Sequence, residues 1–313
     1  MMSIRSTLCS SVLLLATVAT ADHHNGLNFP ATQGNSNTGN FLPGVFKYGY
    51  SSTNVSAAQQ LGVSSLRLGF NTDTALSKGE GTAVLAKMKA YIDQIGAGIL
   101  CMWGKGSDSS HGDGRVDSVE DAIAAWKAVH AAFNGSNVYY EIFNEPFGYK
   151  DASEYFSVMK QIYEGAGLPR DKVILDGTGY ADSVAELGKL WPGMMAYHFY
   201  PNWQPDGKRT QENFSNRCQG DLKGYSHRTF VTEAGAALDE DNKDYEQYDP
   251  SGHDGDVNSL RGLDDCLSTL HEAGAPVLGV YPWHGYDNGD SYSFFGAKNA
   301  NGRAKLQRIQ KRS

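Results

Sequence analysis

Short apolar runs alternate with stretches of helical periodicity along almost the whole chain, and this alternation restricts the possible folds more than any other feature. In the helical stretches apolar residues recur every three or four positions, and two of these stretches end on glycine. Strands too apolar to face water, separated by helices, indicate a parallel sheet covered by helices. The eight apolar runs lie near residues 25, 64, 97, 138, 173, 194, 228 and 277.

Eight such units predict a (β/α)8 barrel, formed as a single domain by residues 22–313. A doubly wound open sheet is the alternative. No G-x-G-x-x-G motif follows the first apolar run, and the sequence shows no second domain, so the barrel is favoured.

Residues 1–21 have the pattern of a secretory signal peptide. Arg5 precedes the apolar segment "SVLLLATVA", and small residues stand at Ala19 and Ala21. The apolar segment is too short to span a bilayer. We therefore expect a secreted, extracellular protein, and we expect it to be a monomer. The formal net charge of -8 argues against nucleic acid or an anionic membrane as a partner and favours a neutral substrate.

Three cysteines remain after the predicted signal peptide. Cys218 and Cys266 lie in two helical stretches that we expect to be neighbours, and an exported chain meets an oxidising environment, so we predict that they form a disulfide. The alternative is three buried thiols, and Cys101 in "GAGILCMW" is expected to be one in either case. The N-x-[ST] triplets that would fit a glycosylated surface begin at Asn54, Asn134 and Asn213.

The predicted strands end on unusually polar or aromatic residues. In a (β/α)8 barrel the chemistry takes place at the carboxyl ends of the strands, so these residues are the candidates for a functional site. From the second, fourth, sixth, seventh and eighth strands they are Arg67, Asn144, Glu145, His198, Tyr200, Glu233 and Trp283.

Two of these candidates are acids that end apolar strands. Glu145 follows "YYEIF" and Glu233 follows "RTFVT", so both should project into one mouth. Two carboxyl groups in a partly dry cleft do not ionise independently: we expect one to have a raised pKa and the other to stay charged. Cleavage of a glycosidic bond requires such a pair.

The segments "IFNEP", "AYHFYPN", "FVTEAG" and "YPWHG" resemble, in this order, those of the clan A barrel glycoside hydrolases, and most closely the cellulase-type family 5. The resemblance covers essentially the whole mature chain. It implies that Glu145 is the general acid/base and Glu233 the nucleophile. Retaining hydrolysis of a β-linked polysaccharide follows, and it needs no cofactor and no metal.

The resemblance also implies roles for the surrounding residues. Asn144 would bind the sugar 2-hydroxyl, and Arg67 and Tyr200 would hydrogen-bond Glu233. His198 would lie near Glu145. Trp283 would be the platform on which the sugar stacks, and its peptide bond to His284 would be cis.

The third strand departs from the family pattern. A histidine usually stands near its end, and here "ILCMWGKG" offers Cys101, Met102 and Trp103. Trp103 is either a wall of a sugar subsite or an ordinary buried tryptophan.

Several other polar and aromatic residues have plain structural interpretations. Glu141 has the same parity as Glu145, so we expect a hydrogen-bonded carboxylate inside the barrel. His23 and His24 could bind copper, but a frayed end is the simpler interpretation. The acidic segment 238–256 does not have the spacing of a calcium loop, so we expect a solvated loop. Each of Trp203, Tyr286 and Tyr292 is either a platform for a sugar or an anchor for its loop.

The sequence therefore predicts a secreted, retaining, endo-acting β-glycosidase with β-1,4-glucan as substrate. The alternatives are β-1,4-mannan or β-1,3-glucan on the same scaffold. A barrel that binds glycans without cutting them is a third possibility, but such a protein would not need both acids with Arg67 and Tyr200 around one of them.

Overall fold

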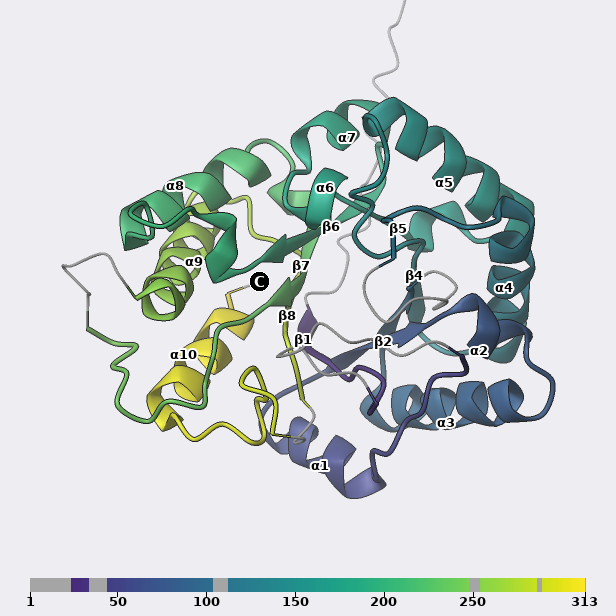
Figure 1. Ribbon diagram of the computed structural model, residues 1–313, viewed down its shortest axis with the longest axis horizontal. Helices are drawn as coiled ribbons and strands as arrows, with labels where there is room; N and C mark the ends of the chain where they lie inside the picture. Colours follow the sequence, from purple (N-terminus) through teal and green to yellow (C-terminus); the bar gives the residue numbers. More distant parts are fainter. Residues whose placement is uncertain (1–23, 34–43, 104–111, 248–253, 286–288, 313) are drawn as a thin grey trace, which may run out of the picture.

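The computed structural model of the chain describes residues 24–33, 44–103, 112–247, 254–285 and 289–312. The predicted signal peptide lies outside these residues. Eight parallel strands pair in sequence order, and β8 pairs with β1, so the barrel is closed (Figure 1). The prediction of a single-domain (β/α)8 barrel is confirmed. The strands are β1 (His24–Asn28), β2 (Ser65–Phe70), β3 (Gly98–Met102), β4 (Val138–Glu141), β5 (Val173–Asp176), β6 (Met194–Phe199), β7 (Thr229–Ala234) and β8 (Gly279–Pro282).

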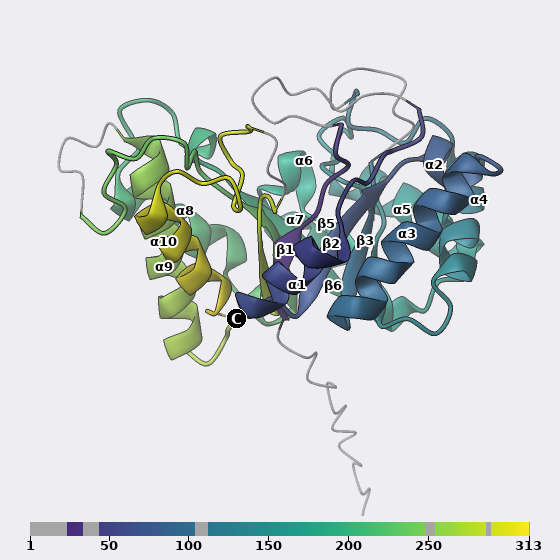
Figure 2. The same ribbon diagram turned by 90° about the horizontal axis from the view of Figure 1, so that it is seen from below.

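Helices surround the barrel on its outside (Figure 1). In Figure 2, α2 and α6, which directly follow β2 and β5, lie toward the same end of the barrel. This is the end at which the strands finish, and it carries the candidate site. The helices are α1 (Ser52–Gln60), α2 (Thr72–Leu76), α3 (Glu80–Ile95), α4 (Val119–Ala132), α5 (Ala152–Ala166), α6 (Thr178–Ala181), α7 (Ala185–Leu190), α8 (Gln211–Leu222), α9 (Gly255–Glu272) and α10 (Ala300–Gln310), with 3-10 turns at Arg170–Lys172, Pro201–Trp203 and Ser226–Arg228.

The ends of the helices follow local sequence signals. The Asp151 side chain accepts hydrogen bonds from the backbone N–H groups of Ser153 and Glu154 and so caps the start of α5. The two helices predicted to close on glycine are α5 and α9. The C-cap of α5 is Gly167, with a φ of 72°, whereas the C-cap of α9 is Ala273 and Gly274 follows it with a φ of 71°. Both glycines have the left-handed conformation that glycine adopts without steric cost.

The core has two parts because every strand buries both of its faces. One face packs against the helices and forms a large apolar layer that includes Trp126 and Trp191. The other face points into the barrel and fills its lower part. The buried residues of this interior cluster are Ile99, Tyr139, Ile174, Ala196, Phe230, Leu278 and Tyr281. The interior is therefore a packed core with the candidate site above it.

The predicted disulfide joins α8 to α9. Sγ of Cys218 lies 2.01 Å from Sγ of Cys266, and the two Cα atoms are 6.1 Å apart. Cys101 is a buried free thiol, as expected. In the part of the chain that the structure describes, no helix combines the length and the apolar character needed to cross a membrane.

The three glycosylation triplets differ in their exposure. Asn134 is exposed after α4, whereas Asn54 and Asn213 are half-buried. The Asn54 side chain takes part in the capping box of α1, and Nδ2 of Asn213 donates to the Lys208 carbonyl over 2.9 Å. Asn134 is therefore the best placed of the three for a glycan.

Candidate active site

A polar layer lies directly above the apolar interior of the barrel. Side chains of a strand alternate between its faces, so the residue two positions after an interior residue also points inward. In four consecutive strands this next inward position is polar or carries a thiol. These residues are Cys101, Glu141, Asp176 and His198, which follow Ile99, Tyr139, Ile174 and Ala196, and all four are completely buried.

Arg67 of β2 holds this layer together. Its guanidinium makes two hydrogen bonds to the carboxylate of Glu141, over 2.7 and 2.8 Å, and one to Oε1 of Glu233 over 2.5 Å. The predicted contact with Glu233 and the predicted structural role of Glu141 are both observed. The remaining acceptors are Oδ1 of Asn28 at 3.0 Å, Oδ1 of Asn144 at 2.7 Å and Sγ of Cys101 at 3.2 Å.

Glu145 lies just beyond β4 in an unusual backbone conformation. Its φ is 50°, in the left-handed region that costs a residue other than glycine about 1–3 kcal/mol. Its N–H donates to Oδ2 of Asp176 over 2.9 Å. Its side chain meets His198, as predicted, with 2.9 Å between Oε1 and the imidazole Nδ1. The backbone is thus held in a conformation that directs the carboxyl group toward His198 and Glu233.

The carboxyl group of Glu233 lies close to that of Glu145. The Tyr200 hydroxyl donates to Oε2 of Glu233 over 2.7 Å, as predicted, and His198 Nδ1 lies 3.7 Å from the same oxygen. One oxygen of each carboxyl group and one nitrogen of His198 all lie within 4.8 Å of one another. The two acids that the strand ends suggested are therefore neighbours in space, 88 positions apart in the sequence.

The environment differs between the two acids. Burial raises the pKa of Glu145, the negative charge of Glu233 raises it further, and the hydrogen bond from His198 opposes both effects. Burial also raises the pKa of Glu233, against the expectation that only one pKa would be raised. Arg67 and Tyr200 lower the pKa of Glu233, because both donate to its carboxylate. The permanent guanidinium charge makes Glu233 the acid better suited to remain an anion.

The two tryptophans predicted near the site face each other. The indole rings of Trp103 and Trp283 have centroids 5.7 Å apart and planes within 20° of parallel. Gly69 of β2 leaves room for Trp103, because a Cβ at this position would lie only 3.0 Å from the indole Nε1. The peptide bond between Trp283 and His284 is cis, as predicted.

An aromatic group joins Trp203, which was named from the sequence, to Phe147 and Tyr180, which were not; Phe147 follows Glu145 by two positions. Phe147 and Tyr180 stack with centroids 4.5 Å apart and planes at 24°, and Trp203 lies 5.9 Å beyond Tyr180. Tyr180 is 43% exposed, and its neighbour Ala181 has a φ of 56°. Nε1 of Trp203 donates to the His198 carbonyl over 2.9 Å, so Trp203 is anchored to β6.

The remaining histidines and tyrosines named from the sequence are partly described by the structure. His24 does not lie in a frayed end, because it is buried in β1 with its ring 5.8 Å from that of Tyr139. Tyr292 packs edge-on against Tyr200 at 5.9 Å, whereas His23 and Tyr286 lie outside the described residues.

The acidic segment 238–256 is described except for residues 248–253, and its last two residues begin α9. Lys243 lies among its acids, with Nζ 2.7 Å from Asp256, 3.6 Å from Glu240 and 3.7 Å from Asp254. This single cationic side chain offsets part of the negative charge of the three acids.

Two groups of side chains in the described structure have the composition of a metal site. They are Glu141 with Asp176 and His198, and Glu145 with His198 and Glu233. Arg67 donates to a carboxylate in each group. A metal cation would have to share these carboxylates with the guanidinium, and the repulsion between the two cations opposes its binding.

Comparisons with known proteins relate this chain to others through its structure. No family model matches the sequence, and no curated protein matches it. Endoglucanase Cel5A from Pseudomonas stutzeri superposes with a TM-score of 0.63 at 14% identity, over 92% of each chain. The endo-beta-1,4-glucanase Xac0029 from Xanthomonas axonopodis pv. citri gives 0.63 at 13% identity, over 92% of this chain and 99% of that one.

A hyperthermophilic endocellulase from the archaeon Pyrococcus horikoshii gives a TM-score of 0.60 at 13% identity, over 93% of this chain and 92% of that one. At such identities the similarity concerns the fold, and it extends over nearly the full length of these chains. The chain therefore has the (β/α)8-barrel fold that these endoglucanases share, as the four sequence motifs predicted.

Proposed function

We propose that this protein is a secreted, retaining endo-β-glycosidase that hydrolyses a β-1,4-linked glucan. The observation that carries the proposal is the pairing of Glu145 and Glu233. Their closest carboxyl oxygens lie within 4.8 Å, and each acid has its own hydrogen-bond partners. Retaining glycosidases place these groups about 5–5.5 Å apart, whereas inverting enzymes need about 6.5–9.5 Å to admit a water molecule.

The geometry supports a double displacement. A Glu233 oxygen attacks the anomeric carbon while the glycosidic C–O bond breaks, and Glu145 gives its proton to the departing oxygen. In the second step Glu145 removes a proton from water, the water oxygen bonds to the anomeric carbon, and the ester bond to Glu233 breaks. Residues of this chain supply every proton donor and acceptor in this scheme.

The surrounding side chains fit the binding of a sugar. Because Oδ1 of Asn144 accepts from Arg67, the Asn144 amide is oriented with Nδ2 as its donor to the 2-hydroxyl. Trp283 offers an aromatic face for the apolar side of a pyranose, and Trp103 is proposed as a second wall of this subsite. The exposed Tyr180, which stacks on Phe147 two positions after Glu145, offers a further aromatic face and so favours a polymeric substrate.

The choice of β-1,4-glucan rests on the names of the structural neighbours, which are endoglucanases and endocellulases. Secretion is supported by the disulfide, since such bonds persist in oxidising compartments. Substrate choice is tested by a hydrolysis screen over soluble cellulose, mannan, xylan and laminarin. A preference for mannan or laminarin would correct the substrate and leave the mechanism in place.

The mechanism is tested by stereochemistry and by two substitutions. We expect NMR to detect the β-anomer as the first product. Glu233→Ala should abolish turnover of every substrate, because it removes the carboxylate that attacks the anomeric carbon. Glu145→Ala should retain more activity on aryl glycosides with good leaving groups, which need little protonation, and added azide should increase that activity. An α-anomer as first product would refute the double displacement.

A further inference from the structure

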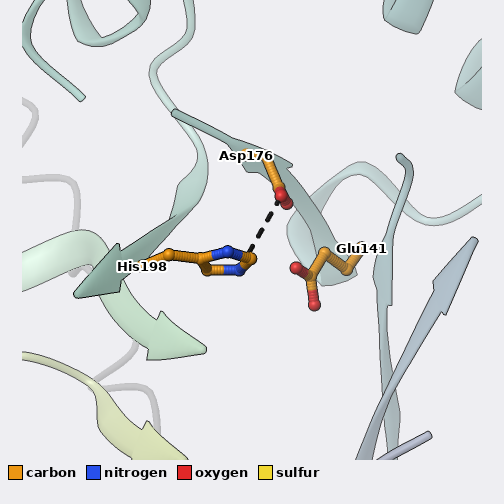
Figure 3. A group of neighbouring side chains, drawn as sticks. All are labelled: Glu141, Asp176 and His198. Carbon is orange, nitrogen blue, oxygen red and sulfur yellow. Dashed lines mark ion pairs between the residues drawn. The ribbon is translucent and has the colours of Figure 1, made fainter. Parts of the chain in front are cut away.

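Asp176 is a buried acid at the site to which the mechanism above assigns no role. It is the last residue of β5, its side chain is completely buried, and it points into the barrel toward Glu141 and His198 (Figure 3). A buried carboxyl group is costly unless other groups require it. Its contacts indicate what it does for the site.

The first contact is with the main chain of Glu145. Oδ2 of Asp176 accepts the Glu145 N–H over 2.9 Å. Glu145 is buried and has a φ of 50°, so this N–H points away from any regular strand pairing and needs a partner inside the protein. The next peptide is also tied down, because the Phe147 N–H donates to the Glu145 carbonyl over 2.8 Å. Asp176 therefore fixes the peptide that aims the Glu145 carboxyl group.

The second contact is with the imidazole that holds the side chain of Glu145. Oδ2 of Asp176 lies 4.0 Å from Nε2 of His198, and Nδ1 of the same ring lies 2.9 Å from Oε1 of Glu145 (Figure 3). One carboxyl oxygen thus borders both the main chain of Glu145 and the ring that contacts its side chain. A change of charge on Asp176 would act on Glu145 through both routes.

The neighbours of Asp176 favour its uncharged form. One of its oxygens lies within 4.8 Å of a Glu141 oxygen, and Arg67 donates both to Glu141 and to Glu233 but makes no hydrogen bond or ion pair with Asp176 in the described structure. Burial raises the pKa of Asp176 well above its ordinary value, and the charge of Glu141 raises it further. The titratable groups that face it are Glu141 from β4, His198 from β6, Arg67 from β2, Cys101 from β3 and Tyr155 from α5.

We propose that Asp176 is a positioning residue for Glu145: its uncharged carboxyl group fixes the Glu145 peptide and keeps negative charge away from His198. The role rests on the proposed function, in which Glu145 is the general acid/base. An anion at this position would draw a proton onto His198 and would hold a proton on Glu145 more tightly. Either effect would impair a group that must release and recover a proton in each cycle.

Two substitutions separate the parts of this role. Asp176→Asn keeps an uncharged side chain of the same shape with an oxygen that can accept the Glu145 N–H. It should keep kcat/KM within about threefold of the wild type and leave both limbs of the pH profile in place. Asp176→Ala removes the acceptor. We expect a fall in kcat of about 10- to 100-fold on polysaccharide with little change in KM, because a misplaced catalytic group costs rate.

The choice of substrate shows whether Asp176 acts through Glu145. On an aryl glycoside with a good leaving group, formation of the glycosyl-enzyme needs little acid assistance, so Asp176→Ala should lose much less activity in that step. A general structural defect would reduce this step equally for both substrates. Equal losses would overturn the proposal. So would a shift of the basic limb to lower pH in Asp176→Asn, which is the result expected if Asp176 were an anion in the wild type.

A readout without turnover keeps the test independent of the proposed function. Nitrogen-15 NMR of the histidines, with His198 assigned by its substitution, reports whether the imidazole is charged. We expect a neutral ring at about pH 7 and above in the wild type and in Asp176→Asn, since burial lowers the pKa of His198 below its ordinary value. A charged His198 in the wild type that becomes neutral in Asp176→Asn would refute the proposal, whether or not any glycan is hydrolysed. If Asp176→Ala does not fold, Asp176→Asn and the NMR measurement still decide.

Discussion

Replacing Arg67 by methionine should show how strongly the buried charges of the site depend on one cation. The substitution keeps an unbranched side chain but removes five hydrogen bonds to oxygen, three of them to the carboxylates of Glu141 and Glu233. Removing one partner of a buried ion pair costs about 3–5 kcal/mol, because the remaining charge is left uncompensated. We expect Arg67→Met to lower the free energy of unfolding by about this amount at pH 7.

The loss should depend on pH in a defined direction. In the wild type Arg67 lowers the pKa of Glu141 against the effect of burial, so Glu141 is ionised in both the folded and the unfolded chain at pH 5–7. Without Arg67, burial alone raises this pKa, so the folded variant binds a proton that the unfolded chain does not. Its stability should then decrease as pH rises through the new pKa, by up to about 1.4 kcal/mol per pH unit. The destabilisation should therefore be smaller at pH 5 than at pH 7.

Urea unfolding followed by tryptophan fluorescence at the two pH values measures both effects. The matched control is Arg115→Met, because Arg115 contacts Glu154 over the same 2.5 Å as Arg67 contacts Glu233, but with both side chains more than a third exposed. An exposed pair contributes about 0–1 kcal/mol. Adding Glu141→Gln to Arg67→Met should reduce the pH dependence to the part that comes from Glu233, whose pKa Arg67 also lowers. A loss of stability in Arg67→Met as small as that in Arg115→Met, or equal at both pH values, would show that the buried carboxylates do not depend on Arg67.

Three further substitutions test separate parts of the structure. Tyr200→Phe removes a hydrogen bond that lowers the pKa of Glu233, so the acidic limb of kcat/KM should move to higher pH; an unchanged limb in a pH-rate profile would contradict this. The double variant Cys218→Ser, Cys266→Ser opens a loop of 48 residues. The barrel should still fold, and urea unfolding should show a free energy of unfolding lower by about 4 kcal/mol. A decrease below about 1 kcal/mol would argue against the loop-entropy explanation. Tyr180→Ala should raise KM for long glucans several-fold and leave short aryl glycosides unaffected, and equal effects on both substrates would exclude a remote sugar platform.

The barrel could be predicted because its strands are constrained on both faces. Runs such as "AGILCMW" and "VYYEIFN" are apolar throughout, which suits strands buried between helices and a packed interior. The same principle identified Glu145 and Glu233 as candidates, since an acid at the end of such an apolar run is costly to bury unless other groups of the site require it. His24 was misjudged because its burial depends on the pairing of β1 with β8, a contact that barrel closure creates.

Asp176 obeys the same rule, because it ends the apolar run "VILDG", and alternation with Ile174 places it inside the barrel. Its role could not be deduced, since the contact with the Glu145 N–H arises from the left-handed turn after β4. Tyr180 was missed for a different reason. It lies in α6, whose interior includes non-helical backbone at Gly179 and Tyr180, so no periodic pattern marks its exposed ring.

The charges of the buried layer suggest how the proposed enzyme could change its acid into a base. Before reaction, Glu233 is an anion, and its charge helps to keep a proton on Glu145. When Glu233 bonds to the sugar it loses that charge, at the same moment at which Glu145 has given its proton away. The raising effect of Glu233 on the pKa of Glu145 is then absent, while the hydrogen bond from His198, which favours the carboxylate, remains. An uncharged Asp176 adds no new repulsion at this stage, so Glu145 can stay ionised until it removes the proton from the incoming water.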